Sequence, residues 1–156
     1  MSDDEIGRLF EGAPRFLDRL DAAGPFTTDA ELFAAARAIA HRMPEPEQVE
    51  LLDAHPRLGA PREAVSALSY AEQGYDRPDR PDPEAAAVAT RLDELNDAYE
   101  ARFGFRYCVF VAGRSRADLL PDLAAALDAD RAAELRRGLD AVIDIAMDRR
   151  AKLHGR

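Results

Sequence analysis

The chain has 156 residues, of which 47% are hydrophobic and 33% are charged, and its formal net charge at pH 7 is −9. This length and balance are typical of one globular domain and exclude an intrinsically disordered chain. The negative charge argues against a nucleic-acid partner, and no apolar run approaches the roughly 20 residues of a membrane-spanning helix.

Apolar residues at helical spacing predict two helices in the first part of the chain. The stripe in IGRLFEGAPRFLDRL is divided at Pro14, and Gly24 ends the second piece. Thr28, followed by Glu31 three residues on, is a capping-box pattern that predicts the start of a third helix. A fourth helix begins with the prolines of PEPEQVELLDAH and ends before Pro56, because a residue that precedes proline avoids the helical region.

The second half of the chain predicts further helices around one exposed loop. LGAPREAVSALSYAEQGYD is expected to form a loop and one or two short helical turns, and DRPDRPDP an exposed loop. Asp82 caps a helix of about 20 residues that ends at Gly104. FRYCVFVAG has strand character but no partner strand, so we expect an extended crossing segment or a helix there. Ser115 and Asp130 begin the last two helices.

We therefore expect a compact all-α domain of about seven helices that comprises residues 1–156. The acidic N-terminus, MSDDEIGRLF, lacks the features of a secretory signal, so we expect a cytoplasmic protein. Cys108, the single cysteine, excludes an internal disulfide and is predicted to be a buried structural thiol. Lys152, the single lysine, lies among charged residues, which argues against a buried Schiff-base lysine and its cofactors.

The sequence predicts no metal site and no phosphate-binding loop. The three histidines, His41, His55 and His154, do not have the spacing of a metal pair on a helix. There is also no Walker motif and no Gly-x-Ser-x-Gly nucleophile elbow. These absences argue against metal sites, phosphate loops and serine nucleophiles of these kinds.

Three short stretches place a polar group beside a glycine or proline. They are HPRLG with His55, SYAEQGY with Glu72 and Gln73, and VAGRS with Arg114. Each has a plain structural interpretation: a histidine stabilised at a helix C-terminus, an ordinary surface ending and a solvated arginine. Together they could transfer protons through His55 and Glu72 while Arg114 binds a carboxylate, which would suit a small anionic substrate.

Five segments in one order resemble the OHCU decarboxylase family, where OHCU is 2-oxo-4-hydroxy-4-carboxy-5-ureidoimidazoline. They are FEGAPRFLDRL, LLDAHPRLG, LSYAEQGY, LNDAYEARFGFRYCVFVAGRS and ELRRGLDAVIDIAMDRRAKL. The resemblance implies an all-helical homodimer that uses no cofactor or metal. It further implies stereospecific decarboxylation of OHCU to (S)-allantoin in urate degradation.

The resemblance also implies roles for individual residues. His55 would be the catalytic histidine, with a pKa near neutral, and Pro56 would keep its setting rigid. Glu72 would be the catalytic glutamate, and Ser69 and Gln73 would hold the ring and ureido groups of the substrate.

The family's carboxylate-binding arginine falls within VAGRSR, where Arg114 is the predicted residue and Arg116 the alternative. Many relatives have an arginine at the position of Ala112. Two other functions stay open: an enzyme of the same fold that acts on another small carboxylated heterocycle, and a non-catalytic helical binding module. An enzyme requires the three functional side chains to meet in one cleft within about 10 Å, the scale of a ligand pocket.

Overall fold

A computed structural model describes residues 2–59 and 83–154 of the protein. Within these residues there are seven helices and no strand, which confirms the predicted all-α class. The helices are α1 (Asp3–Leu9), α2 (Pro14–Ala23), α3 (Asp29–Arg42), α4 (Glu45–Asp53), α6 (Pro83–Phe103), α7 (Arg116–Ala126) and α8 (Arg131–His154). The loop predicted over DRPDRPDP and the turns predicted before it lie outside the described residues.

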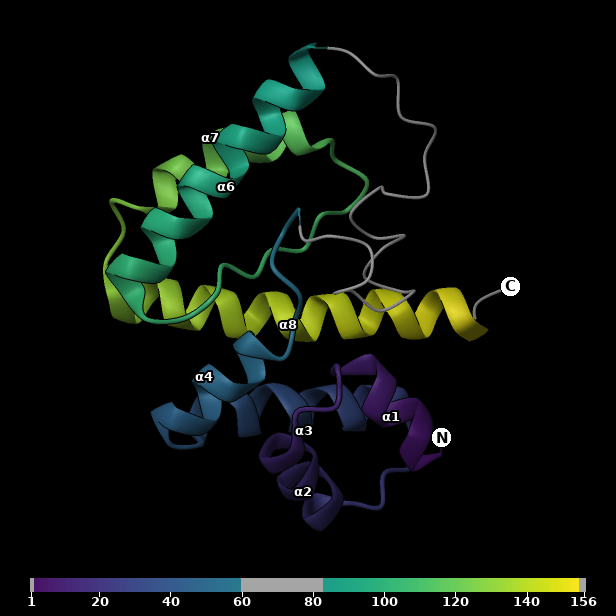
Figure 1. The fold of residues 1–156 in the computed structure, drawn as a ribbon. Coiled ribbons are helices and arrows are strands. Elements are labelled where there is room, and N and C mark those ends of the chain that lie inside the picture. The colour runs from purple at the N-terminus through teal and green to yellow at the C-terminus, as the bar shows by residue number, and fades with distance from the viewer. Residues whose placement is uncertain (1, 60–82, 155–156) are drawn as a thin grey trace.

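Helix α8 runs through the middle of the molecule (Figure 1). Helices α1, α3 and α4 pack against it on one side, with α2 packed on α3 and α4. Helices α6 and α7 pack on each other across α8 from that group, and the segment between them passes beside α8 (Figure 1). No helix in the described parts of the chain is long and apolar enough to cross a bilayer.

The predicted helix boundaries within the described residues agree with the structure, apart from one difference in a cap, while the predicted Asp82 cap lies outside those residues. Thr28 Oγ1 accepts a hydrogen bond from the Glu31 amide at 3.1 Å, as a capping box requires. The Glu31 carboxylate, however, accepts from the amide of Thr27 at 2.9 Å and from its hydroxyl at 2.7 Å. The carboxylate thus satisfies two donors on the residue before the cap. Ser115 and Asp118 form a complete capping box at the start of α7.

The segment after α6 is extended, as the first of the two sequence alternatives predicted. Gly104 ends α6 with a φ of +79°, a conformation that glycine adopts without steric cost. Tyr107 packs edge-on against Tyr99 of α6, with 5.1 Å between the ring centroids. Side chains satisfy part of the hydrogen bonding of this segment's backbone. Arg137 donates to the Cys108 carbonyl at 2.9 Å, and Asp53 accepts from the Arg106 amide at 3.0 Å. These bonds replace part of what a partner strand would supply.

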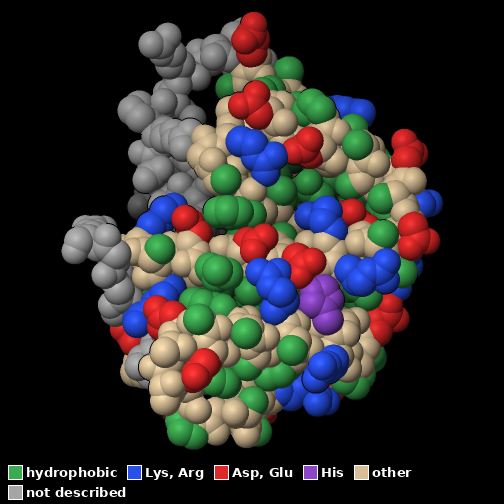
Figure 2. Space-filling view, turned by 180° about the vertical axis from the view of Figure 1, so that it is seen from behind, with side chains coloured by type: hydrophobic (Ala, Val, Ile, Leu, Met, Phe, Trp, Pro, Cys, Tyr) green, Lys and Arg blue, Asp and Glu red, His purple; other side chains and the backbone are tan. Residues whose placement is uncertain are grey.

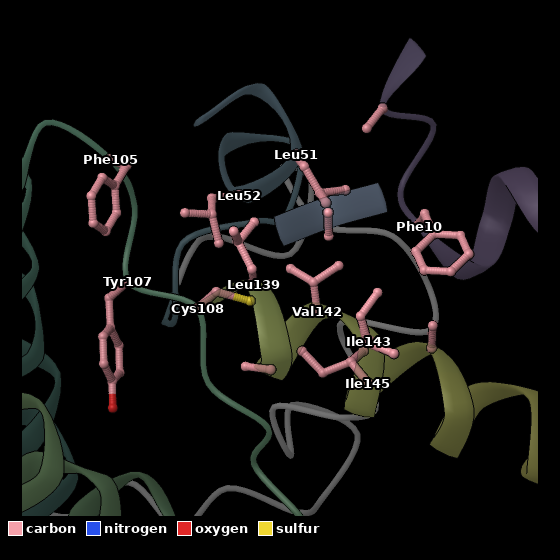
Figure 3. Packing of buried hydrophobic residues seen from close by; sticks show 14 of the residues in the cluster. Phe10, Leu51, Leu52, Phe105, Tyr107, Cys108, Leu139, Val142, Ile143 and Ile145 are labelled. Carbon is pink, nitrogen blue, oxygen red and sulfur yellow. The ribbon is translucent and has the colours of Figure 1, made fainter. Parts of the chain in front are cut away.

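One part of the core, which draws on all seven described helices, lies where α4, α8 and this segment meet (Figure 3). Leu51 and Leu52 of α4 are fully buried and face Leu139 and Val142 of α8, which are also fully buried (Figure 3). Full burial of one such side chain stabilises the fold by about 1.5–3 kcal/mol. Cys108 is buried against this core, as predicted. The C-terminal end of α4, which leads into His55, is therefore held in place.

Gly138 of α8 lies against Leu52 so closely that a side chain would collide with it. An added Cβ would lie 3.1 Å from Leu52 Cδ2, and Leu52 is fully buried. Gly138→Ala should therefore lower the free energy of unfolding by about 1–2 kcal/mol, because overpacking outweighs the gain in helix propensity. Gly7→Ala on α1 is the control, since nothing lies within 4 Å of its added Cβ. Urea denaturation would measure the free energy of unfolding of the two variants. An equal increase in Gly138→Ala and Gly7→Ala would contradict the close packing of Gly138 on Leu52.

Candidate functional site

A cavity of about 330 Å³ lies beside His55, and three of the described parts of the chain line it. The loop after α4 contributes His55, Pro56 and Leu58, the crossing segment contributes residues 107–113, and α8 contributes Ile145, Asp148, Arg149 and Lys152. The size is at the lower end of the range for small-molecule sites. The cavity therefore suits a compact substrate.

His55 enters this cavity because α4 ends immediately before it. Its amide still donates to the Leu52 carbonyl at 3.1 Å, and its Nδ1 lies 3.2 Å from the Leu51 carbonyl oxygen. The Arg106 guanidinium donates to the carbonyls of Asp53 at 2.7 Å and of His55 at 3.1 Å. These bonds satisfy helix-end carbonyls, and Pro56 prevents the helix from continuing. Backbone and side chain of His55 are both fixed.

The imidazole of His55 is a neutral base. Burial lowers its pKa to about 4, helped by the positive charge of Arg149 and opposed by Glu11 and the Leu51 carbonyl. The expectation of a pKa near neutral is therefore wrong, because the ring is only 4% exposed. A carbonyl only accepts, so Nδ1 carries the proton and Nε2 has the lone pair. Nε2 is buried without a hydrogen-bond partner among the described residues.

Arg149 of α8 is a buried cation in the cavity wall that the sequence analysis did not single out. It is 1% exposed. It donates to the carbonyls of Arg8 at 3.0 Å and Leu9 at 3.3 Å, and to Glu11 Oε1 at 2.8 Å. The sequence signal that could have identified Arg149 was its place on α8, four residues after the buried Ile145 and so on the same buried face of the helix. A charged residue on an apolar stripe is a marker of function or of a buried ion pair.

Two of the family-like segments meet at the rim of the cavity. Asn96 of α6 is fully buried, and its Nδ2 donates to the Leu58 carbonyl at 2.9 Å. Arg57 pairs with Asp97 and, at 2.9 Å, with Glu100. HPRLG is thus held to LNDAYE by a buried hydrogen bond and an ion-pair cluster. This contact gives a physical reason for the two motifs to occur together.

A buried polar cluster centred on Glu134, which is 3% exposed, supports the part of the cavity wall that contains Tyr107. It accepts from the Tyr99 hydroxyl at 2.7 Å and from Arg137 Nε at 2.8 Å. The Arg137 guanidinium also lies over the Tyr107 ring, 4.9 Å from its centroid. Burial raises the pKa of Tyr107 to about 12, so this cavity residue is a neutral phenol at pH 7.

Arg114 does not line the cavity. It follows a turn in which Ala112 and Gly113 have φ values of +52° and +77°, and its amide donates to the Val111 carbonyl at 3.1 Å. Its guanidinium donates to the carbonyls of Val111 at 3.0 Å and Phe110 at 2.7 Å, and to Asp122 at 2.7 Å. Arg116 is not a lining residue either, whereas Ala112 is.

The structure therefore brings His55 and Pro56 to the cavity but not Arg114. Ser69, Glu72 and Gln73 lie outside the described residues, so the expected meeting of His55 and Glu72 stays a prediction. In the described part of the chain, no group of three or more His, Cys, Asp or Glu side chains could hold a metal ion.

On the face in Figure 2, charged side chains of both signs lie interspersed.

Comparison with known proteins identifies relatives along nearly the whole chain. The family model of OHCU decarboxylase matches residues 2–151. The uric acid degradation bifunctional protein PucL of Bacillus subtilis is 28% identical, and the match covers 96% of this chain but 30% of that protein. The 2-oxo-4-hydroxy-4-carboxy-5-ureidoimidazoline decarboxylase of Haloferax volcanii is 30% identical, and the match covers 92% of this chain and 83% of that protein.

Two solved structures share the fold. A crystal structure of OHCU decarboxylase in the presence of (S)-allantoin matches with a TM-score of 0.76 and 22% identity over the full length of both chains. A crystal structure of (S)-allantoin synthase matches with a TM-score of 0.66 and 22% identity over 94% of this chain and 47% of that chain. From the family model and the Haloferax relative together, the chain belongs to the OHCU decarboxylase family.

Proposed function

We propose that this protein decarboxylates OHCU to (S)-allantoin in urate degradation, without a cofactor. The observation that carries the proposal is the buried, neutral imidazole of His55, whose Nε2 lone pair has no partner among the described residues. It lies in a cavity of suitable size, in a chain of the OHCU decarboxylase family. A neutral base next to a fixed cation suits the removal of a proton from an anionic substrate.

The reaction requires one base and a place for the electron pair. OHCU carries a hydroxyl and a carboxylate on the same ring carbon. His55 Nε2 accepts the hydroxyl proton as the bond to the carboxylate breaks and CO2 leaves. The electron pair of the broken bond moves into the adjacent ring C=N, and its nitrogen takes up the proton held by His55. The hydroxyl oxygen becomes a carbonyl as the neighbouring ring carbon is protonated by a proton that comes from solvent. One proton is therefore taken up overall, and the substrate itself supplies the electron sink.

The remaining sequence-based assignments complete the proposal. Glu72 orients the ring nitrogens and delivers the proton to one face, which sets the handedness of the product. Ser69 and Gln73 hold the ring and ureido groups. Pro56, which lines the cavity, keeps His55 from joining the helix. For Arg114 the support is the sequence pattern alone, because its guanidinium is engaged by Phe110, Val111 and Asp122.

The wider setting is proposed as well. Residues 1–156 form one domain and the protein acts in the cytoplasm, both from the sequence pattern, and two copies form a homodimer, as the resemblance implies. Light scattering coupled to size-exclusion chromatography would test the dimer directly.

The function predicts a stereochemical signal. Urate would be converted enzymatically to OHCU with and without this protein, and circular dichroism would follow the product. We expect rapid growth of the (S)-allantoin signal with the protein. A slow drift to racemic allantoin, unchanged by the protein, would instead favour another carboxylated heterocycle as the substrate, or a binding module.

His55→Ala should lower kcat by at least about 100-fold, because it removes the proposed base. The matched control is His41→Ala, since His41 lies on α3, pairs with Asp140 at 2.8 Å and does not line the cavity. The same circular dichroism assay compares the two variants at equal concentration. Near-normal turnover by a folded His55→Ala protein would disprove the assignment.

His55 also makes the stability depend on pH. Its pKa is about 4 when folded and about 6.5 when unfolded, so the unfolded state binds more protons between these values. The free energy of unfolding should therefore fall as pH decreases through this window, by about 2 kcal/mol from His55 between pH 7.5 and pH 5. Urea denaturation of the wild type and of His55→Gln at both pH values isolates the contribution of His55 to the free energy of unfolding. Identical pH dependence in the two proteins would show that His55 is not buried as a neutral base.

A further inference from the structure

We propose that Asn96 of α6 is a positioning residue for the reaction, because it fixes the 55–59 segment after α4 and with it the direction of the His55 imidazole. The inference rests on the proposed function and names a residue that acts through His55. Asn96 is fully buried, and its Nδ2 donates to the Leu58 carbonyl at 2.9 Å. This hydrogen bond joins α6 to the far end of the segment that begins at His55.

The 55–59 segment is held at its two ends by different parts of the chain. At its start, Arg106 donates to the His55 carbonyl at 3.1 Å. Near its end, the Leu58 carbonyl accepts from Asn96. The segment passes α8 from the side of α4 towards the side of α6 (Figure 1). The bond from Asn96 therefore fixes the segment, and the imidazole at its start, relative to the helices across α8 from α4.

The ion pairs beside this hydrogen bond hold the 55–59 segment less firmly. Arg57 pairs with Asp97, whose side chain is 76% exposed, and with Glu100, whose side chain is 36% exposed. Ion pairs in contact with water contribute little, because water screens the charges and two long side chains must be ordered. The bond from Asn96 is buried and does not compete with water. Among the described contacts between this segment and α6, it is the firmer one.

Stability alone does not explain an asparagine at position 96. A carbonyl only accepts, so the amide nitrogen of Asn96 is the atom that contacts Leu58. Its Oδ1 is buried without a hydrogen-bond partner among the described residues. An unpaired buried acceptor costs at least as much as one neutral hydrogen bond contributes. The side chain thus gains little for the folded state, and its bond to the cavity wall points to a role in the site.

The position of the 55–59 segment matters because proton transfer depends on short distances. Pro56 and Leu58 line the cavity together with His55. A shift of the segment would move this part of the wall and the imidazole together, and a displacement of about 1 Å near reacting groups can lower a rate by about 100-fold. Holding the segment in place therefore keeps Nε2 of His55 directed at the proton that it removes.

The first test is Asn96→Leu, which keeps the approximate size of the side chain and removes the donor. In the circular dichroism assay of OHCU decarboxylation, we expect kcat to fall at least about tenfold, because the base is misplaced. KM should change by less than about threefold, because the residues proposed to hold the ring and ureido groups lie outside this segment.

Gln48→Leu is the matched control. Gln48 of α4 is 9% exposed and donates to the Ala40 carbonyl at 3.0 Å, and it does not line the cavity. The substitution therefore removes the same kind of buried bond, from a side-chain amide to a carbonyl, outside the site. We expect kcat to be unchanged in this variant.

A double variant separates positioning from general damage to the fold. If Asn96 acts through His55, Asn96→Leu should not lower the rate further in a His55→Ala background, because the group that it positions is already absent. Damage to the fold would lower the rate by the same factor in both backgrounds. Asn96→Ala repeats the comparison without the added methyl groups of leucine, and urea denaturation checks that each variant is folded.

Nuclear magnetic resonance of the imidazole nitrogens provides a readout that needs no turnover. In the wild type at pH 7, His55 should give the signals of one neutral tautomer, with the proton on Nδ1 beside the Leu51 carbonyl. In Asn96→Leu, a released ring should give signals averaged over both tautomers, whereas Gln48→Leu should match the wild type. The His55 signals are identified by their absence from His55→Ala.

Three results would overturn the inference. One is a kcat of Asn96→Leu within about twofold of the wild type. Another is an equal loss of rate with and without the His55 imidazole, and the third is an unchanged set of His55 signals in a folded Asn96→Leu protein. A wild type that does not accelerate OHCU decarboxylation would disprove the proposed function and the role of Asn96 in it. The imidazole signals would still show whether Asn96 positions His55, so the two failures can be told apart.

Discussion

Burial of the His55 imidazole beside a fixed positive charge is the constraint that organises the site, because both effects disfavour the protonated ring. Arg149 keeps its proton at any physiological pH, and its charge is compensated by Glu11 and two backbone carbonyls. Burial, with a smaller contribution from the charge of Arg149, lowers the pKa of His55 to about 4, so the ring is neutral at pH 7. The carbonyl of Leu51 then decides which nitrogen keeps the remaining hydrogen. The base in the cavity is thus produced by its surroundings rather than by the histidine itself.

The helices follow from local signals in the sequence. Pro14, Thr28, Ser115 and Gly104 each act through bonds or dihedral limits within a few residues of themselves, so their effects could be predicted without knowing the fold. The same applies to the end of α4, where Pro56 decides the boundary. The one cap that differs from the prediction, at the start of α3, differs only locally, because the Glu31 carboxylate accepts from the amide of Thr27 in place of that of Thr28.

The site depends on long-range contacts, and there the sequence says less. The positive charge that adds to the effect of burial on the pKa of His55 belongs to Arg149, which lies more than 90 positions away on α8, and no spacing rule joins the two. The direction of Arg114 was also beyond the sequence, because the turn at Ala112 and Gly113 and the nearby Asp122 turn its guanidinium towards the protein. His55 itself could be singled out, since a histidine between a helix and a proline is an unusual local arrangement.

The site uses different degrees of burial for different tasks. A base that must accept a proton at neutral pH is kept neutral by burial, and His55 is 4% exposed. The cation that shapes the potential can be buried only with full compensation, which Arg149 has. Lys152, in the wall of the same cavity, is 65% exposed and pairs with Asp148, so water screens its charge. The buried charge of Arg149 is held by its carbonyl partners and Glu11 before any ligand arrives, and a charge fixed in advance acts on the reacting groups without the cost of rearrangement.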